Sequence, residues 1–203
     1  MSARARVDFT EGDRAHVTIT YLVQATPESR EVPLTGLLFG DVEISSVQVS
    51  IAGTESPVAI THQPGERLRA SIPLGTTVLD EGPISFVLRY EVSGAAPSAG
   101  VRELRVPVLA VMWPPAEALP GIFRAELLLP PGLTVLGSFP SDLREVEVGG
   151  PYVTELPVLP ALLSLRVTDG GGRLRVTTIL NAAVLVLLGA VLVGGWRYLR
   201  RTA

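Results

Sequence analysis

The stretch Ala-His-Val-Thr-Ile-Thr-Tyr-Leu-Val-Gln, residues 15–24, decides the fold class. Its apolar side chains stand at every second position, and the residues between them are mostly polar. A period of two places successive side chains on opposite faces of a β-strand. We therefore predict a strand that buries one face, formed by Val17, Ile19, Tyr21 and Val23.

The neighbouring sequence extends this pattern in both directions. Residues 4–10 alternate in the same way, and Glu11-Gly12-Asp13 has the composition of a turn, so the chain is expected to open with a β-hairpin. The same alternation predicts further strands at residues 47–51, 68–72 and 84–92.

A loop of small residues, 93–100, separates these strands from a second group. The second group is predicted at residues 101–111, 122–129, 133–136, 143–148, 152–156 and 162–168. Short strands at this spacing predict a mainly β fold, an antiparallel β-sandwich over residues 1–168. One sandwich and two sandwich-like halves that meet near 93–100 both fit the pattern.

An apolar run, Ile179 to Trp196, follows the strands, and Asn181 is its only strongly polar side chain. As a helix it would cover roughly 27 Å, close to the roughly 30 Å of a bilayer's hydrocarbon core. We predict one transmembrane helix over residues 176–196. A glycine-rich joint at 169–175 precedes it, and a basic tail at 197–203 follows it.

The residues after the run fit a membrane interface, where aromatic rings settle at headgroup level and arginines reach phosphates. The predicted interface anchors are Trp196, Arg197, Tyr198, Arg200 and Arg201. The first eight residues do not form a secretory signal, so the chain resembles a tail-anchored protein. We expect a single-pass protein of the cell (inner) membrane and favour a cytoplasm-facing over a periplasmic domain.

Small residues form a line along the predicted transmembrane helix. Ala183, Ala190 and Gly194 fall within about 40° of one another on a helical projection. Such a seam lets a second helix approach closely. We interpret it as a helix-docking seam, with the lipid bilayer and other membrane-protein subunits as partners. The alternative is a lipid-facing anchor in which the small residues are incidental.

Composition excludes several function classes. All twenty acidic residues precede the apolar run, together with fourteen of the seventeen arginines, and this acidic balance argues against nucleic acid as a partner. The chain has no cysteine, so disulfides, thiolate catalysis and cysteine-ligated metals are excluded.

The titratable residues do not form a recognisable catalytic or metal-binding motif. His16 is expected on the solvent face of its strand and His62 in a turn, so both read as surface imidazoles. We predict no catalytic residues, no cofactor and no metal, and therefore no enzyme. Trp113, which lies beside two prolines, is either a core residue or a contact for a partner protein.

Paired carboxylates are the exception that could support acid–base chemistry. By period two, Asp41 shares a strand face with Glu43, and Glu145 shares one with Glu147. Solvated strand edges of an acidic domain explain these pairs as well, and we favour that interpretation.

Three features in order resemble the β-sandwich part of predicted bacterial membrane proteins of unknown function. They are Phe-Val-Leu-Arg-Tyr-Glu-Val-Ser-Gly at 86–94, then Trp113, then Leu-Leu-Pro-Pro-Gly-Leu at 128–133. That group combines a Tyr-x-Val strand, a tryptophan-containing segment and a Leu-Pro-x-Gly strand end with a membrane anchor. The resemblance implies a sandwich with an anchor, and it brings no catalytic residues.

Three functions fit these observations. The leading hypothesis is a structural accessory subunit of a larger membrane complex, for example a photosynthetic or respiratory assembly. The second is a binding or adhesion module displayed on a membrane. The third is a membrane-anchored hydrolase that uses dispersed carboxylates.

Overall fold

The fold is described from a computed structural model. It describes residues 1–9, 14–24, 31–38, 40, 42–63, 67–74, 83–94, 101–111 and 121–169. Strands make up the secondary structure of this part of the chain, and no helix occurs in it. The prediction of a mainly β fold is therefore confirmed. The predicted joint at 169–175 lies outside the described residues except for Asp169, and the predicted transmembrane helix and basic tail lie outside them entirely.

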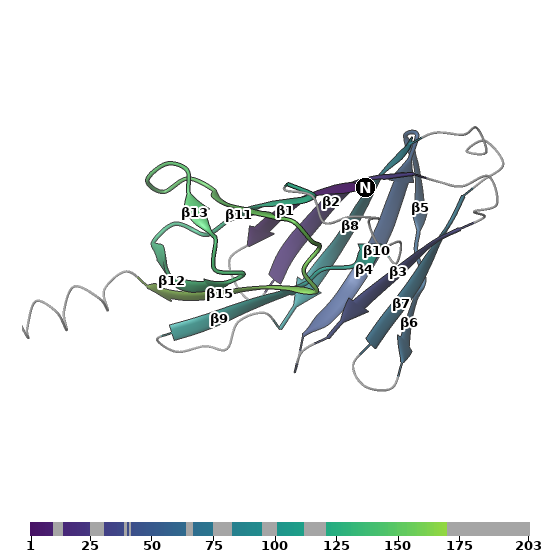
Figure 1. Ribbon diagram of the computed structural model, residues 1–203. Coiled ribbons are helices and arrows are strands. Elements are labelled where there is room, and N and C mark those ends of the chain that lie inside the picture. Colours follow the sequence, from purple (N-terminus) through teal and green to yellow (C-terminus); the bar gives the residue numbers. More distant parts are fainter. Residues whose placement is uncertain are drawn as a thin grey trace, which may run out of the picture.

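The largest sheet, sheet A, forms one layer of the molecule (Figure 1). In spatial order its strands are β13 (Arg144–Glu145), β14 (Tyr152–Leu156), β11 (Phe123–Leu128), β1 (Ser2–Phe9), β2 (Arg14–Gln24), β8 (Pro83–Ser93), β4 (Glu43–Ile51) and β5 (Thr54–Pro57). Strands from both sides of the 93–100 stretch thus share one sheet, because β11 pairs with β1.

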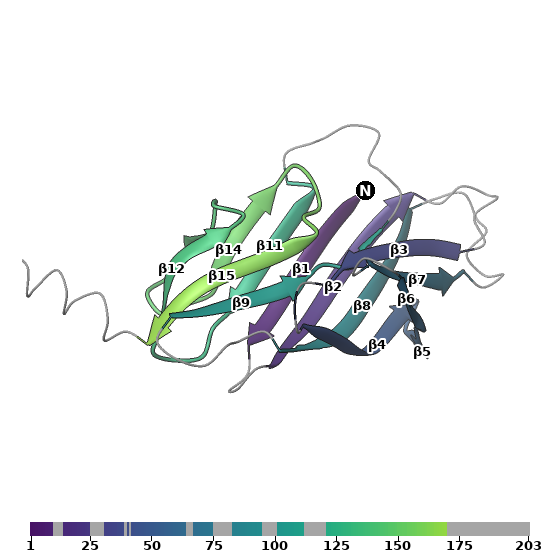
Figure 2. The same ribbon diagram turned by 90° about the horizontal axis from the view of Figure 1, so that it is seen from below.

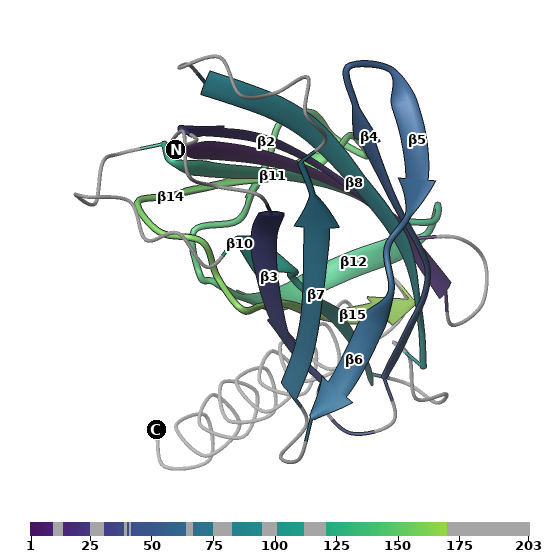
Figure 3. The ribbon, with the colours of Figure 1, turned by 90° about the vertical axis from the view of Figure 1, so that its right-hand side faces the viewer.

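Two smaller sheets lie on the same side of sheet A (Figures 1 and 3). Sheet B contains β10 (Ala110–Val111), β3 (Glu31–Leu37), β7 (Arg67–Pro73) and β6 (Ile60–Gln63). Sheet C contains β12 (Leu133–Phe139), β15 (Leu162–Asp169) and β9 (Val101–Pro107), which lie side by side in Figure 2. We call these three sheets together the β-domain.

The alternating stretch at 15–24 behaves as its sequence predicts. It forms β2, pairs antiparallel with β1 as the expected hairpin, and pairs on its other side with β8. Val17, Ile19, Tyr21 and Val23 are buried in a core that contains residues from all three sheets. Burial of these apolar side chains is the main favourable term in folding.

One expectation about the strands is wrong, and three strands were not predicted. The β1–β11 pair is parallel, so the fold is not purely antiparallel. The short edge strands β5 and β6 were not predicted, because four residues with little alternation form a strand only through pairing with a neighbour. Strand β3 was also missed, since Pro33 and Gly36 interrupt its pattern.

Gly36 is required by close packing against the core. A methyl group at this position would lie 2.7 Å from the Leu109 Cδ2 atom, and the Leu109 side chain is buried. We expect Gly36→Ala to lower the free energy of unfolding by about 1–3 kcal/mol, because the packed core must shift. Chemical denaturation measures this. Gly137→Ala is the matched control, since a methyl group there meets no atom within 4 Å. Equal losses in both variants would contradict the packing argument.

One segment of chain passes from sheet C to sheet B. Strand β9 pairs with β15, and only Val108 and Leu109 separate β9 from β10, which pairs with β3. Two tyrosines of sheet A reach across the core to this crossing. The Tyr90 hydroxyl donates to the Pro107 carbonyl oxygen at 2.7 Å, and the Tyr21 hydroxyl donates to the Leu109 carbonyl oxygen. The tyrosines therefore bond carbonyls at the point where the chain changes sheets.

Candidate functional site: a pocket beside β13 and β14

Most residues that the sequence singled out lie outside the described part of the chain. They are Trp113, the seam residues Ala183, Ala190 and Gly194, and the interface anchors Trp196, Arg197, Tyr198, Arg200 and Arg201. A search of the described residues for a helix long and apolar enough to cross a bilayer finds none. The seam, the anchors and the Trp113 contact stay predictions.

The structure places His16 as expected. It lies on the exposed face of β2, and its Nδ1 atom is 3.6 Å from the Glu91 Oε1 atom. Among the described residues, no cluster of histidines and carboxylates has the arrangement of a metal site.

The expected pairing of Glu145 with Glu147 on one strand face is wrong. Strand β13 ends at Glu145, and Glu147 lies in the turn that follows. The Gly149 amide donates to the Glu145 carboxylate at 2.8 Å, and the Gly150 amide donates to the Glu147 carbonyl oxygen at 2.7 Å. Gly149 has a φ of 75°, which lets the chain turn where the sequence pattern predicted a strand to Val148.

A pocket of about 520 Å³ opens beside β13 and β14. It is lined by Asp142, Arg144, Glu145, Val146, Val153 and Glu155. Strand pairing brings these residues together, since Arg144 lies opposite Val153, and Glu145 lies opposite Tyr152. The sequence pattern predicted the strand at 152–156 with the correct bounds. The pattern gave no indication of the pocket.

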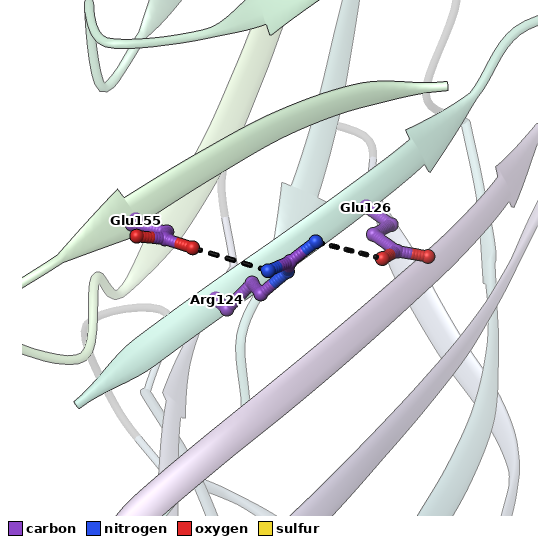
Figure 4. Close-up of polar contacts among 3 residues, drawn as sticks. All are labelled: Arg124, Glu126 and Glu155. Atoms are coloured by element: carbon purple, nitrogen blue, oxygen red, sulfur yellow. Dashed lines mark hydrogen bonds and ion pairs between the residues drawn. The ribbon is translucent and has the colours of Figure 1, made fainter. Parts of the chain in front are cut away.

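Two ion pairs on the outer face of sheet A share Arg124, and one of them includes a residue of the pocket lining. Arg124 lies between two carboxylates, 3.2 Å from Glu155 and 3.5 Å from Glu126 (Figure 4). These side chains are well exposed, so each pair contributes little to stability. Arg124 thus contacts the carboxylate of Glu155, a residue of the pocket lining.

Tyr152 lies opposite Glu145, a residue of the pocket lining, in the pairing of β13 with β14. Burial raises the pKa of its hydroxyl, and the nearby Glu145 carboxylate raises the pKa further. The hydroxyl is therefore protonated at neutral pH and available as a hydrogen-bond donor.

The lining combines apolar and charged groups in a way that suits a mixed ligand. Val146 and Val153 supply apolar surface, and the lining also contains three carboxylates and one guanidinium. A concave surface of this kind can hold a group that is partly apolar and carries a positive charge or hydrogen-bond donors.

Comparison with known proteins gives matches to solved structures. No protein family model and no curated protein matches the sequence. The fold is similar to part of LTA4 hydrolase from Saccharomyces cerevisiae, with a TM-score of 0.52 and 12% identity over 82% of this chain and 28% of that chain. An aminopeptidase N family protein from Idiomarina loihiensis matches with a TM-score of 0.46 and 14% identity, over 82% of this chain and 29% of that chain.

The similarity to LTA4 hydrolase contradicts the prediction that the chain is not an enzyme, because that structure is an enzyme's. We therefore withdraw that prediction. At 12% identity, the likeness to yeast LTA4 hydrolase shows a shared fold, and this chain spans about 28% of that protein's length. Activity, substrate and partners are accordingly matters of proposal.

Proposed function

We propose that the chain is a single-pass membrane protein that acts as an accessory subunit of a larger membrane complex. In this proposal a β-sandwich, formed by sheets A, B and C, stands outside the bilayer, and residues 176–196 form the transmembrane helix. The apolar run supports the anchor, since it is long enough to cross a bilayer and is flanked by aromatic and arginine side chains.

The observation that carries the subunit role is the pocket beside β13 and β14. The turn between its two strands lies at the same end of the β-domain as Asp169, the last described residue. Tyr152 is paired with Leu127 near the end of β11, four residues separate β11 from β12, and the first residue of β12 lies opposite Asp169. A partner segment that emerges from the bilayer beside this chain could reach the pocket.

The charge of the pocket indicates the kind of partner segment. Cytoplasmic segments next to transmembrane helices carry an excess of lysine and arginine. A lining with three carboxylates and one guanidinium attracts such a segment, and the two valines receive its apolar side chains. The pocket therefore fits a cytoplasm-facing β-domain that holds a basic juxtamembrane segment of another subunit.

Photo-crosslinking tests this assignment. We expect a photoreactive amino acid in place of Val146, which lines the pocket, to capture one membrane protein that also co-purifies with the unmodified chain. The control position is Leu22, which is 45% exposed on β2 and away from the pocket. Crosslinking of the same protein from both positions, or no crosslink from position 146, would contradict the proposal.

A second candidate function follows from the same pocket. It gathers the carboxylates of Asp142, Glu145 and Glu155, and two nearby carboxylates can serve as acid and base in hydrolysis. The test is hydrolysis of peptide and glycoside substrates by the purified full chain. Glu155→Gln should remove the activity if the carboxylates act in hydrolysis. Equal turnover by wild type and variant would exclude this role.

A further inference from the structure

One end of the β-domain collects the points where several strands begin or end. The last residue of β15, Asp169, lies opposite Leu133 at the start of β12, and its neighbour Thr168 lies opposite Val101 at the start of β9. The turn between β13 and β14 lies at the same end, because Tyr152 pairs with Leu127 close to the end of β11. Figure 1 shows β12, β15 and the start of β9 together at the left of the molecule.

Apolar side chains are exposed at this end. Val148 is fully exposed at the tip of the turn between β13 and β14, and Val101 is 49% exposed. The connection from β11 to β12, residues 129–132, reads Leu-Pro-Pro-Gly and carries no charge. Exposed valines at a turn and at a strand end do not pack in the core. Such exposed apolar side chains can instead mark a surface that contacts a membrane or another protein.

The length of chain beyond Asp169 limits how far this end can stand from a bilayer. Seven residues lead from Asp169 to Val176, where the predicted helix begins, and a fully extended chain of that length spans at most about 25 Å. The tether therefore keeps the Val148 and Val101 end at the membrane and raises the effective concentration of lipid there.

We propose that this end of the β-domain rests on the lipid surface, with the Val148 and Val101 side chains in the interfacial layer. The inference depends on the proposed membrane anchor. The contact is apolar in character, because the exposed side chains that make it are valines. Two carboxylates lie near Val148 in the sequence, Glu145 at the end of β13 and Glu147 in the turn. Phosphatidylcholine vesicles are the probe for this contact, because a neutral surface does not repel the two carboxylates.

Site-directed labelling of the full chain tests the contact directly. The chain has no cysteine, so Val148→Cys and Val101→Cys each accept one nitroxide label without further changes. Val158→Cys is the matched control, because Val158 is 51% exposed and lies beyond the end of β14 that pairs with the start of β11. Each labelled chain is reconstituted in phosphatidylcholine vesicles, and relaxation is compared for a water-soluble nickel complex and for oxygen dissolved in lipid.

We expect labels at 148 and 101 to be several-fold less accessible to the nickel complex than the label at 158, and more accessible to oxygen. This difference in accessibility should persist at high salt. It should disappear when the labelled chain is diluted into a lipid-free mixture of solvent and detergent. Equal nickel accessibility at 148 and 158 in vesicles would overturn the inference while leaving the anchor intact. Failure of the chain to float with the vesicles would instead overturn the proposed function.

Discussion

Removal of the hydroxyl groups of Tyr21 and Tyr90 is expected to destabilise the β-domain strongly. Each hydroxyl donates to a main-chain carbonyl at the crossing between sheets C and B, and both tyrosines are buried. Tyr→Phe at either position leaves a carbonyl without its donor, which costs about 1–3 kcal/mol. The double variant Tyr21→Phe, Tyr90→Phe should therefore lose several kcal/mol in chemical denaturation, a large part of a domain's stability.

The control is Thr20→Val, which changes an exposed hydroxyl on the outer face of β2 and should alter the free energy of unfolding by well under 1 kcal/mol. If the double variant unfolded at the same denaturant concentration as this control, the tyrosines would not hold the crossing.

The two tyrosines also predict a loss of stability at alkaline pH. Burial raises the pKa of both hydroxyls above the ordinary value of about 10. The unfolded chain therefore releases these protons first, and stability is complete below pH of about 10 and falls as the pH rises above it. The Phe variants should show a shallower fall in the free energy of unfolding over this range than wild type does. An equal slope would exclude the tyrosines as its cause.

Filling the small-residue seam of the predicted helix is expected to separate the chain from its complex. Ala183→Leu, Ala190→Leu and Gly194→Leu together keep the segment apolar, so membrane insertion should be unchanged. The larger side chains push a neighbouring helix away from close contact. We expect much lower recovery of the triple variant with partner subunits, measured by quantitative mass spectrometry after purification from membranes.

The matched control places isoleucine at Leu185, Leu188 and Leu192, on the opposite side of the same helical projection. This variant should be recovered with its partners nearly as well as wild type. Equal recovery of the seam variant and this control would show that the segment serves as a lipid anchor, and would leave the β-domain as the source of partner contacts.

The sequence predicted the strands whose alternation is local. The strand at 15–24 and the strand at 152–156 need only the side chains within them, and both appear where the pattern places them. The parallel pairing of β1 with β11 could not be read in this way. It joins Ala3 to Phe123, and no local pattern encodes a contact over that separation.

The candidate site was missed for a related reason. Period two placed Glu145 and Glu147 on one face, but a turn with hydrogen bonds to Gly149 and Gly150 replaces the expected strand. The pocket lining also includes Glu155, which forms an ion pair with Arg124 of another strand. The Gly149-Gly150 pair was the available signal, since two adjacent glycines mark a turn.

The most direct test of whether the chain is a subunit of a larger membrane complex is purification of the native protein in a mild detergent. The proteins that accompany it are then identified. We expect the chain to elute with other membrane proteins in a fixed stoichiometry, and we expect the association to survive a second separation step. Elution as a free monomer, from membranes in which the chain is intact, would contradict its role as a subunit of a larger complex.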